Sequence, residues 1–371
     1  MREYFFPSLN GRPVADQKLE AWWERISRYL EPAHVRREVV TSNGFALEVN
    51  LVMVPYLPSA LTCSGLRQRP QEIRDKIQDA VTIAKELGDD NIPVTMVGLG
   101  AYTSIATRGG LTLNDHEMAV TTGNAYTAAL TLEGVARAAQ ASGVDLTKAK
   151  VAIVGGGGNI GQILAVFLAG SCASLVLLGS SRRDARTRLD ATRDACLESL
   201  RLGEVGGQSP LPPRTGQPAC TISCETDATA LRDCDVIIVT TSSPDRELLT
   251  PDQLKPGAIV CCTSLPSNLS EAFQEQQGGI VAFDGGLACL PENGRIDFIG
   301  LPAEGLVFGC LAETLLLGFD GHNHSFCKGR VSVAKVHRTW AMAARHGFGL
   351  GAVQLGGRPL MQGGQSSHVH A

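Results

Sequence analysis

Short apolar runs alternate with helical stretches in the middle of the chain, and this alternation constrains the fold more than any other feature. Six such runs lie between residues 150 and 285, namely "VAIVG", "LVLLG", "CTISC", "VIIVT", "AIVCCT" and "GIVAF". Strands that are buried on both faces of a parallel sheet read as continuous apolar runs, and the helices that connect them fill the intervals. The pattern predicts an α/β protein built on a doubly wound parallel sheet.

A glycine-rich stretch follows the first of these runs and opens a helical pattern, in "VAIVGGGGNIGQI". Glycines 156, 158 and 161 fit G-x-G-x-x-G, and glycines 155, 158 and 161 fit the related G-x-x-G-x-x-G spacing. Between a strand and a helix, either register predicts a Rossmann-type loop whose backbone amides meet a dinucleotide pyrophosphate. The predicted contacts are Gly155, Gly156, Gly158, Asn159, Ile160 and Gly161.

The residues after the second run indicate which dinucleotide binds. An NAD site usually has an acid about 20 residues after the glycines to hold the ribose 2′-hydroxyl. This chain instead has Gly179, Ser180, Ser181, Arg182 and Arg183, and hydroxyl and guanidinium groups can hydrogen-bond a 2′-phosphate. We therefore expect NADPH. In the alternative, both arginines are solvated residues that open the next helix, and Asp184 pairs with one of them.

The fourth run ends in "TTSSP", residues 240–244, where a nicotinamide usually lies in this architecture. Thr241 and Ser242 are accordingly predicted cofactor contacts.

Composition argues against several classes of partner. A net charge of −4 and a pI near 6.1 provide no basic field for nucleic acid or anionic lipid. No stretch reaches the roughly 18 apolar residues of a membrane span, and the first residues lack a signal-peptide pattern, so we expect a cytoplasmic protein. The 11 cysteines show no C-x-x-C spacing, which favours buried thiols and no metal site.

The organisation predicted from these patterns has four parts. Residues 1–149 form a substrate-binding α/β domain, 150–300 the NADP-binding Rossmann domain, 301–355 a C-terminal helical segment that carries the nucleophile, and 356–371 a disordered tail with too little apolar content to fold. The C-terminal helices complete the substrate domain.

Cys310 lies in "GLVFGCLAETLLL", between a glycine turn and a leucine-rich helical pattern. A thiol near a helix N-terminus faces the positive end of the dipole, which lowers its pKa and makes it a better nucleophile. A nucleophilic thiol beside a hydride donor suggests attack on a thioester and reduction of the bound acyl group. The alternative is a structural thiol.

Thioester chemistry also needs a donor for the developing oxyanion and a source of protons. Asn124 and Tyr126 in "TTGNAYT" are the candidates, with the hydroxyls of Thr103 and Ser104 as further ones. Each of these residues could equally cap a helix. Glu313 would oppose a thiolate and receives no catalytic role. His322 and His324 resemble a metal pair in spacing alone.

The chain resembles the long-chain acyl-(acyl-carrier-protein) reductases of cyanobacteria from about residue 36 to 349. The motifs that carry the resemblance are "VTSNG", "AYTSI", "TTGNAYTAA", "VDLTKAKVAIVGGGGNIG", "FDGGL", "FGCLAETLLLGFDGHNHSFCKGR" and "ARHGF". The resemblance implies that Cys310 is the acylated nucleophile and that NADPH supplies hydride. The chain departs from the family in its glycine loop, at residues 262–264 and at Tyr126, where the family has histidine.

Together these features predict NADPH-dependent reduction of an acyl thioester to an aldehyde through a Cys310 acyl-enzyme. The expected partners are an acyl carrier protein or a coenzyme A thioester, and a downstream enzyme that uses the aldehyde is a further candidate. Two alternatives stay open. One is a single-step dehydrogenase of a small carbonyl, hydroxy or amino acid, similar to shikimate dehydrogenase. The other is a non-catalytic NADP-binding sensor.

Overall fold

The structure is a computed structural model of the chain, and it divides into two compact units. Unit 1 comprises residues 1–126, 242–244 and 290–349, and unit 2 comprises 127–241, 245–289 and 350–371. The residues described are 22, 25–56, 69–90, 92–114, 118–182, 184–205, 209–243, 245, 247–265, 267–270, 272–273, 279–291, 294–296, 305–351, 354–355 and 358–359. The greater part of the predicted disordered tail lies outside them.

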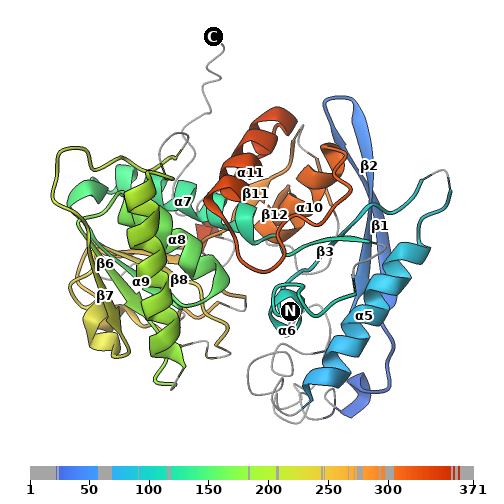
Figure 1. Cartoon of the computed structure of the whole chain (residues 1–371), viewed down its shortest axis with the longest axis horizontal. Coiled ribbons are helices and arrows are strands. Elements are labelled where there is room, and N and C mark those ends of the chain that lie inside the picture. Colours follow the sequence, from blue (N-terminus) through green and yellow to red (C-terminus); the bar gives the residue numbers. More distant parts are fainter. Residues whose placement is uncertain are drawn as a thin grey trace. The chain divides into compact units, whose positions relative to one another are not determined.

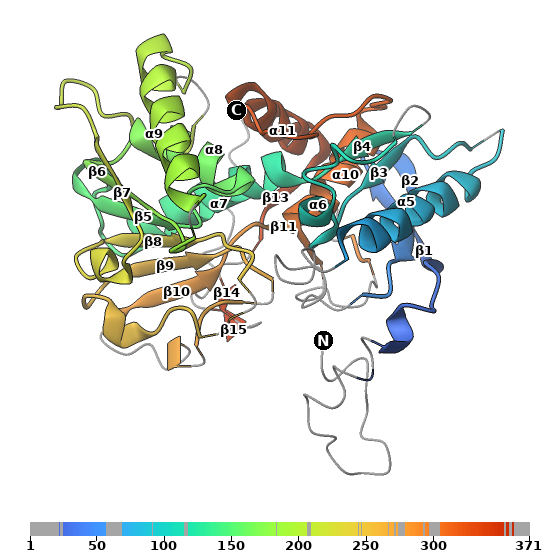
Figure 2. The same cartoon turned by 60° about the horizontal axis from the view of Figure 1, so that its bottom comes forward.

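Unit 2 is built on a six-stranded parallel sheet, which confirms the predicted α/β class. Its strands are β5 (Lys150–Val154), β6 (Ser174–Leu178), β7 (Thr221–Glu225), β8 (Val236–Val239), β9 (Ile259–Cys262) and β10 (Val281–Asp284). They lie in the order β10-β9-β8-β5-β6-β7, with every pair parallel. Figure 2 shows the strands side by side. This is the strand order of a doubly wound sheet. From β5 the chain adds β6 and β7 on one side, and then β8, β9 and β10 on the other side, so the strand order reverses between β5 and β8.

Helices of unit 2 pack against this sheet and against each other. They are α7 (Asn124–Ala141), which begins at the end of unit 1, α8 (Asn159–Ala169) and α9 (Ala185–Leu202). Figure 1 shows α8 and α9 next to each other in front of the sheet. One buried cluster of aliphatic side chains, including Ile237, Val239 and Val260, fills the layer around β8 and β9.

The N-terminal part of unit 1 contains a hairpin and a helix. Strands β1 (Ala33–Ser42) and β2 (Phe45–Met53) pair antiparallel, and α5 (Pro70–Glu86) packs against them (Figure 1). Asn43 and Gly44 join the strands with φ angles of 50° and 78°, and positive values at both positions are typical of a tight hairpin turn. The turn fixes the register of the two strands.

The rest of unit 1 includes the short strands β3, β4 and β12 and the helices α6, α10 and α11. Strand β3 (Met96–Gly98) leads to α6 (Thr103–Ala106) and pairs with β4 (Ala119–Thr121). Strand β12 (Leu306–Phe308) runs directly into α10 (Gly309–Phe319), and α11 (Val333–His346) packs against α10. The remaining short elements are η2 (Leu146–Lys148), η3 (Ala228–Leu231), η4 (Pro251–Gln253), β11 (Leu287–Cys289), β13 (Gly349–Leu350), β14 (Gln354–Leu355) and β15 (Arg358–Pro359).

Candidate functional site

The glycine loop of unit 2 makes a tight turn between β5 and α8. Gly155 has a φ of 90°, and a Cβ there would lie 2.6 Å from the carbonyl oxygen of Thr240. A Cβ on Gly161 would lie 2.4 Å from the carbonyl oxygen of Gly155. Gly158 is the N-cap of α8, and its N–H donates to the Gly155 carbonyl at 2.9 Å. Only glycine fits the first and last positions, so the geometry favours the register of glycines 155, 158 and 161.

This loop fits the pyrophosphate of a dinucleotide. It lies at the carboxyl end of β5, next to β8, where the strand order reverses. Ligands of open α/β sheets bind at that point, and the N-terminus of α8 supplies amides and the positive end of a dipole. Asn159 and Ile160 form the first turn of α8.

The segment after β6 presents the polar residues that the sequence singled out. Ser180, Ser181 and Arg182 are exposed, and Arg183 lies outside the described residues. The carbonyl of Arg182 accepts a hydrogen bond from Ala185 at the start of α9. In the alternative interpretation, Asp184 pairs with Arg182 or Arg183, and the second of these lies outside the described residues. Asp184 instead lies 3.5 Å from Arg188, one turn further along α9.

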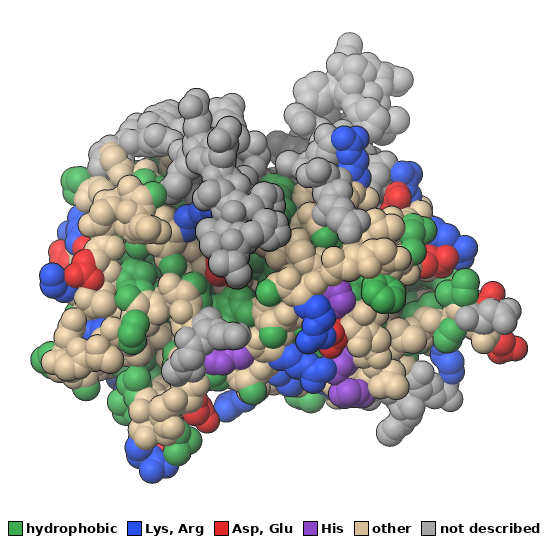
Figure 3. Space-filling view, turned by 90° about the horizontal axis from the view of Figure 1, so that it is seen from above, with side chains coloured by type: hydrophobic (Ala, Val, Ile, Leu, Met, Phe, Trp, Pro, Cys, Tyr) green, Lys and Arg blue, Asp and Glu red, His purple; other side chains and the backbone are tan. Residues whose placement is uncertain are grey.

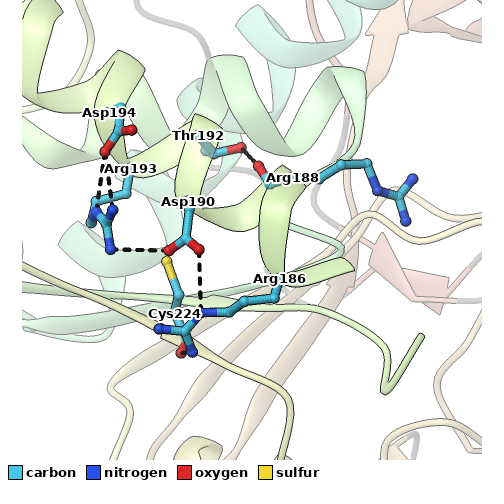
Figure 4. A network of polar contacts seen from close by, with 7 residues as sticks. All are labelled: Arg186, Arg188, Asp190, Thr192, Arg193, Asp194 and Cys224. Atoms are coloured by element: carbon cyan, nitrogen blue, oxygen red, sulfur yellow. Dashed lines mark hydrogen bonds and ion pairs between the residues drawn. The ribbon is translucent and has the colours of Figure 1, made fainter. Parts of the chain in front are cut away.

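Arg188 is a candidate cofactor contact that sequence reasoning missed. A Cβ added to Gly157 would lie 2.9 Å from the Cβ of Arg188, so Arg188 lies directly beside the glycine loop. Figure 4 shows that its guanidinium points away from the ion pairs of Arg193 with Asp190 and Asp194. Arg188 is therefore an α9 arginine beside the glycine loop, and its ion pair is with the exposed Asp184.

At the end of β8, the backbone of Thr241 is held by Ser264. The N–H of Thr241 donates to the Ser264 hydroxyl at 3.1 Å, and that hydroxyl donates to the Thr241 carbonyl at 2.9 Å. Thr241 is the last residue of this segment in unit 2, and Ser242 belongs to unit 1.

Cys310 is the second residue of α10, as predicted, and two loops of unit 1 close on it. One loop follows β3, and the other follows β4. Gly123 in the second loop has a φ of 73°, and a Cβ there would lie 2.1 Å from the Cα of Cys310. The loop can adopt this path only because residue 123 has no side chain.

The expected lowering of the Cys310 pKa is wrong. Burial of the thiol raises its pKa above the ordinary value of 9.0, and the nearby charge of Glu313 adds to this effect. Backbone contacts from Ala101 and Leu311 act in the opposite direction and favour the thiolate. The helix terminus is present, but removal of water from the thiol outweighs it. Burial thus favours the protonated thiol, and the backbone donors favour the thiolate.

Ala101 adopts an uncommon conformation beside this thiol. Its φ is 49°, in the left-handed region that non-glycine residues seldom occupy. Such strain persists where surrounding structure holds it, and it gathers at functional sites. Here it accompanies the backbone contact to Cys310.

Glu313 lies one turn after Cys310 and is completely buried. Its carboxylate accepts hydrogen bonds from the hydroxyl of Thr121 and from the backbone N–H groups of Gly123 at 3.1 Å and Tyr126 at 2.8 Å. Burial raises the pKa of Glu313, while these hydrogen bonds lower it in part. Gly123 has no side chain with which to cap α7, so a carboxylate from α10 satisfies the amides of the first turn instead.

The two predicted catalytic polar residues have different surroundings. Asn124 opens α7 and is partly exposed, whereas the side chain of Tyr126 is almost completely buried. The hydroxyls of Thr103 and Ser104 donate to the carbonyls of Gly100 and Ala101, at 2.6 and 3.3 Å. These two hydroxyls hold the loop that follows β3.

Of the two histidines after α10, His322 is buried, whereas His324 is exposed. His322 is 4% exposed, and its ring lies 3.9 Å from that of His324. Burial lowers the pKa of His322, with smaller contributions from His324 and Arg338. Among the described residues, no group of three or more His, Cys, Asp or Glu side chains could hold a metal ion. Within the same part of the chain, none of the helices is both long and apolar enough to cross a membrane.

Comparisons with known proteins add two relatives. The chain is 26% identical over 350 residues to the long-chain acyl-[acyl-carrier-protein] reductase of Synechococcus elongatus, which covers 90% of this chain and 90% of the relative. It is 24% identical over 300 residues to the aminotransferase PigE of a Serratia species, with 77% of this chain but 32% of that protein covered. No family model matches the chain.

Among solved structures, shikimate 5-dehydrogenase from Listeria monocytogenes is 13% identical, with a TM-score of 0.30 and coverage of 62% of this chain and 66% of that one. The strand order of unit 2 by itself identifies the doubly wound fold. Because the similarity to the Synechococcus protein runs along 90% of both chains, the resemblance to the long-chain acyl-(acyl-carrier-protein) reductases is confirmed.

Proposed function

We propose that the chain is an NADPH-dependent oxidoreductase that reduces an acyl thioester to the aldehyde through a Cys310 acyl-enzyme. The observation that carries the proposal is the setting of Cys310. It lies in the first turn of α10, with backbone donors from Ala101 and Leu311 and a glycine at 123 that leaves room for the helix. The similarity to an acyl-[acyl-carrier-protein] reductase supports the choice of substrate.

The cofactor is NADPH, which supplies hydride when bound. The glycine loop would hold the pyrophosphate, and the hydroxyls of Ser180 and Ser181 with the guanidinium of Arg182 or Arg188 would hold the 2′-phosphate. The part of the chain before residue 150, completed by the C-terminal helices, would bind the acyl substrate.

The reaction begins at the Cys310 sulfur. The thiolate attacks the thioester carbonyl, the tetrahedral oxyanion collapses, and the carrier thiol leaves with the proton that Cys310 gave up. Hydride and a proton then convert the bound acyl group to a hemithioacetal. Its collapse releases the aldehyde and restores the thiol. The N–H groups near Cys310 stabilise negative charge on the sulfur, and Asn124 is the candidate donor to the oxyanion.

The raised pKa of Cys310 also favours a second candidate. A thiol of low acidity suits a structural residue, and the chain would then be a single-step dehydrogenase that binds a small carbonyl substrate directly. Such an enzyme would keep its activity after Cys310→Ala.

Aldehyde formation and NADPH consumption separate the two candidates. Wild type, Cys310→Ala and Cys289→Ala are compared with acyl thioesters of several chain lengths and with small carbonyl acids. Cys289 is a free, partly exposed thiol and serves as the matched control. The proposal expects aldehyde from wild type and Cys289→Ala and none from Cys310→Ala. Equal activity of all three proteins would refute it.

A further inference from the structure

The segment that follows α10 is basic, although the chain as a whole carries a net charge of −4. Residues 320–349 contain five lysines and arginines, four histidines and one acid, Asp320. The five cations are Lys328, Arg330, Lys335, Arg338 and Arg345. Figure 3 looks down on the side that carries α11 and shows Lys, Arg and His side chains gathered around a single acidic group.

Asp320 cannot balance this charge. Its side chain is 13% exposed, and it pairs with Arg345 and, at 3.7 Å, with Arg338. Arg330 is exposed and Lys335 is partly exposed. The lowered pKa of His322, caused by burial and by its positive neighbours His324 and Arg338, is consistent with a positive potential here.

The neighbouring hairpin does not supply the missing acids. It contacts the end of α11 through Ser42, whose hydroxyl donates to the His346 carbonyl at 2.9 Å. The hairpin's Glu38 lies 2.7 Å from Arg36, and its Glu48 lies 3.4 Å from Arg37. These carboxylates are already paired with arginines of the same hairpin.

Two of the cations are held in place by an aromatic ring. The Nζ of Lys335 lies 5.9 Å from the ring centroid of Phe326, and the guanidinium carbon of Arg338 lies 5.8 Å from it. Phe326 is itself buried. Contacts of this kind restrict long side chains before any partner arrives, which lowers the entropic cost of binding.

We propose that this basic surface, formed by Arg330, Lys335, Arg338 and Arg345, docks an acidic acyl carrier protein that delivers the thioester to Cys310. The inference rests on the proposed function and decides between its two carriers. The cations extend along α11 from residue 335 to 345, roughly 15 Å at 1.5 Å per residue. A row of this length suits the surface of a protein partner, whereas a single phosphate would occupy only part of it.

The distance to the nucleophile also suits a carrier protein. Cys310 lies in the first turn of α10, and Asp320 is the C-cap of the same helix. Ten residues of helix separate Asp320, the ion-pair partner of Arg338 and Arg345, from the thiol by roughly 15 Å along the axis. A carrier protein presents its acyl group on a long phosphopantetheine arm, so its surface can dock at this distance from the reacting sulfur. Coenzyme A has the same arm, so the length of the cation row, and not this distance, favours the carrier protein.

A double charge reversal tests the proposal directly. Arg330→Glu with Lys335→Glu leaves both arginine partners of Asp320 intact. Lys148→Glu with Arg232→Glu, at two exposed positions of unit 2, gives the same change in net charge as a control. Calorimetry measures binding of phosphopantetheinylated acyl carrier protein to the full chain at low and physiological salt. Steady-state kinetics then compares a hexadecanoyl group on the carrier with the same group on N-acetylcysteamine.

The proposal expects salt-sensitive carrier binding that weakens roughly tenfold in Arg330→Glu/Lys335→Glu and not in the control. The value of kcat/KM should fall by a similar factor for the carrier thioester and stay unchanged for N-acetylcysteamine. Carrier binding that the reversal leaves intact would overturn the proposal, as would binding to anionic phospholipid vesicles in place of the carrier. If no thioester is turned over, the proposed function fails, and the calorimetry still decides whether the surface binds the carrier.

Discussion

Glu313 accepts a hydrogen bond of 2.8 Å from the backbone N–H of Tyr126, a residue 187 positions earlier in the chain. This contact joins the helix of the candidate nucleophile to the helix that carries Asn124. The carboxylate therefore connects α10 to the start of α7, a role that its sequence position near Cys310 did not suggest.

Removal of this carboxylate should destabilise the protein. Glu313→Ala leaves the amides of Gly123 and Tyr126 and the hydroxyl of Thr121 without their acceptor in a buried place, so we expect a loss of about 2–4 kcal/mol in the free energy of unfolding. Urea denaturation of wild type and Glu313→Ala measures this loss in the free energy of unfolding. Glu86→Ala, at an exposed position in the last turn of α5, is the control and should change stability little. Equal stability of wild type and Glu313→Ala would show that the cap is dispensable.

The ionisation of Glu313 should make stability depend on pH. Because burial raises its pKa above 4.5 in the folded chain, the folded state keeps a proton that the unfolded state loses as pH rises past that value. The free energy of unfolding from this group is therefore greatest below pH 4.5 and falls as pH rises through the folded pKa.

Denaturation of wild type and Glu313→Gln across this range isolates the effect. The glutamine does not titrate, so the stability difference, wild type minus variant, should decrease as pH increases. A difference that grows with pH would mean that the hydrogen bonds to the carboxylate outweigh its burial.

A side chain at position 123 should disrupt the approach to Cys310. Gly123 and Gly143 have similar φ angles of 73° and 69°, but a Cβ meets the Cα of Cys310 at the first position and nothing within 4 Å at the second. Gly143→Ala should cost about 1 kcal/mol for the left-handed conformation alone. Gly123→Ala should cost at least about 2 kcal/mol more. Thermal or chemical denaturation gives both values, and equal losses would mean that the loop moves aside freely.

The Cys310 thiol should react slowly at neutral pH. Since burial raises its pKa above 9.0, the rate of alkylation by iodoacetamide should continue to rise beyond pH 9. Peptide mapping follows Cys310 separately from the other cysteines, and Glu313→Gln should shift its profile to lower pH because a raising charge is removed. A rate that reaches its plateau in the neutral range would restore the expectation of an activated resting thiolate.

Arg188 should contribute to cofactor affinity. If its guanidinium meets the 2′-phosphate, Arg188→Ala should weaken NADPH binding by roughly tenfold or more and leave NADH binding almost unchanged. Fluorescence titration measures both constants. Arg193→Ala is the control. Both arginines pair with carboxylates of α9 or its N-cap, but it is Arg188 that lies against Gly157 of the glycine loop. Equal losses for the two cofactors would place Arg188 at the pyrophosphate.

The six strands of the parallel sheet were predictable because each lies in a largely apolar run between helical stretches. The glycine loop was predictable for a similar reason, since spacing and context define it locally. The β1–β2 hairpin could have been predicted from Asn43-Gly44, a dipeptide that favours its turn type. Arg188 was missed because its nearness to Gly157 depends on how α9 packs.

The chemistry around Cys310 could be predicted only in part. The sequence indicates that the thiol lies near a helix N-terminus, which is correct. It cannot show how much water the loops after β3 and β4 exclude, and this exclusion reverses the expected direction of the pKa shift. The role of Glu313 was equally hidden, because the amides that it binds come from a distant part of the chain.

Intact-protein mass spectrometry tests the central claim most directly. Wild type, Cys310→Ser and Cys289→Ser are mixed with acyl thioesters on carrier protein and on coenzyme A, first without NADPH and then with it. The account predicts one acyl adduct on wild type and Cys289→Ser, none on Cys310→Ser, and loss of the adduct as aldehyde when NADPH is added. Aldehyde production by Cys310→Ser without any adduct would contradict the covalent mechanism.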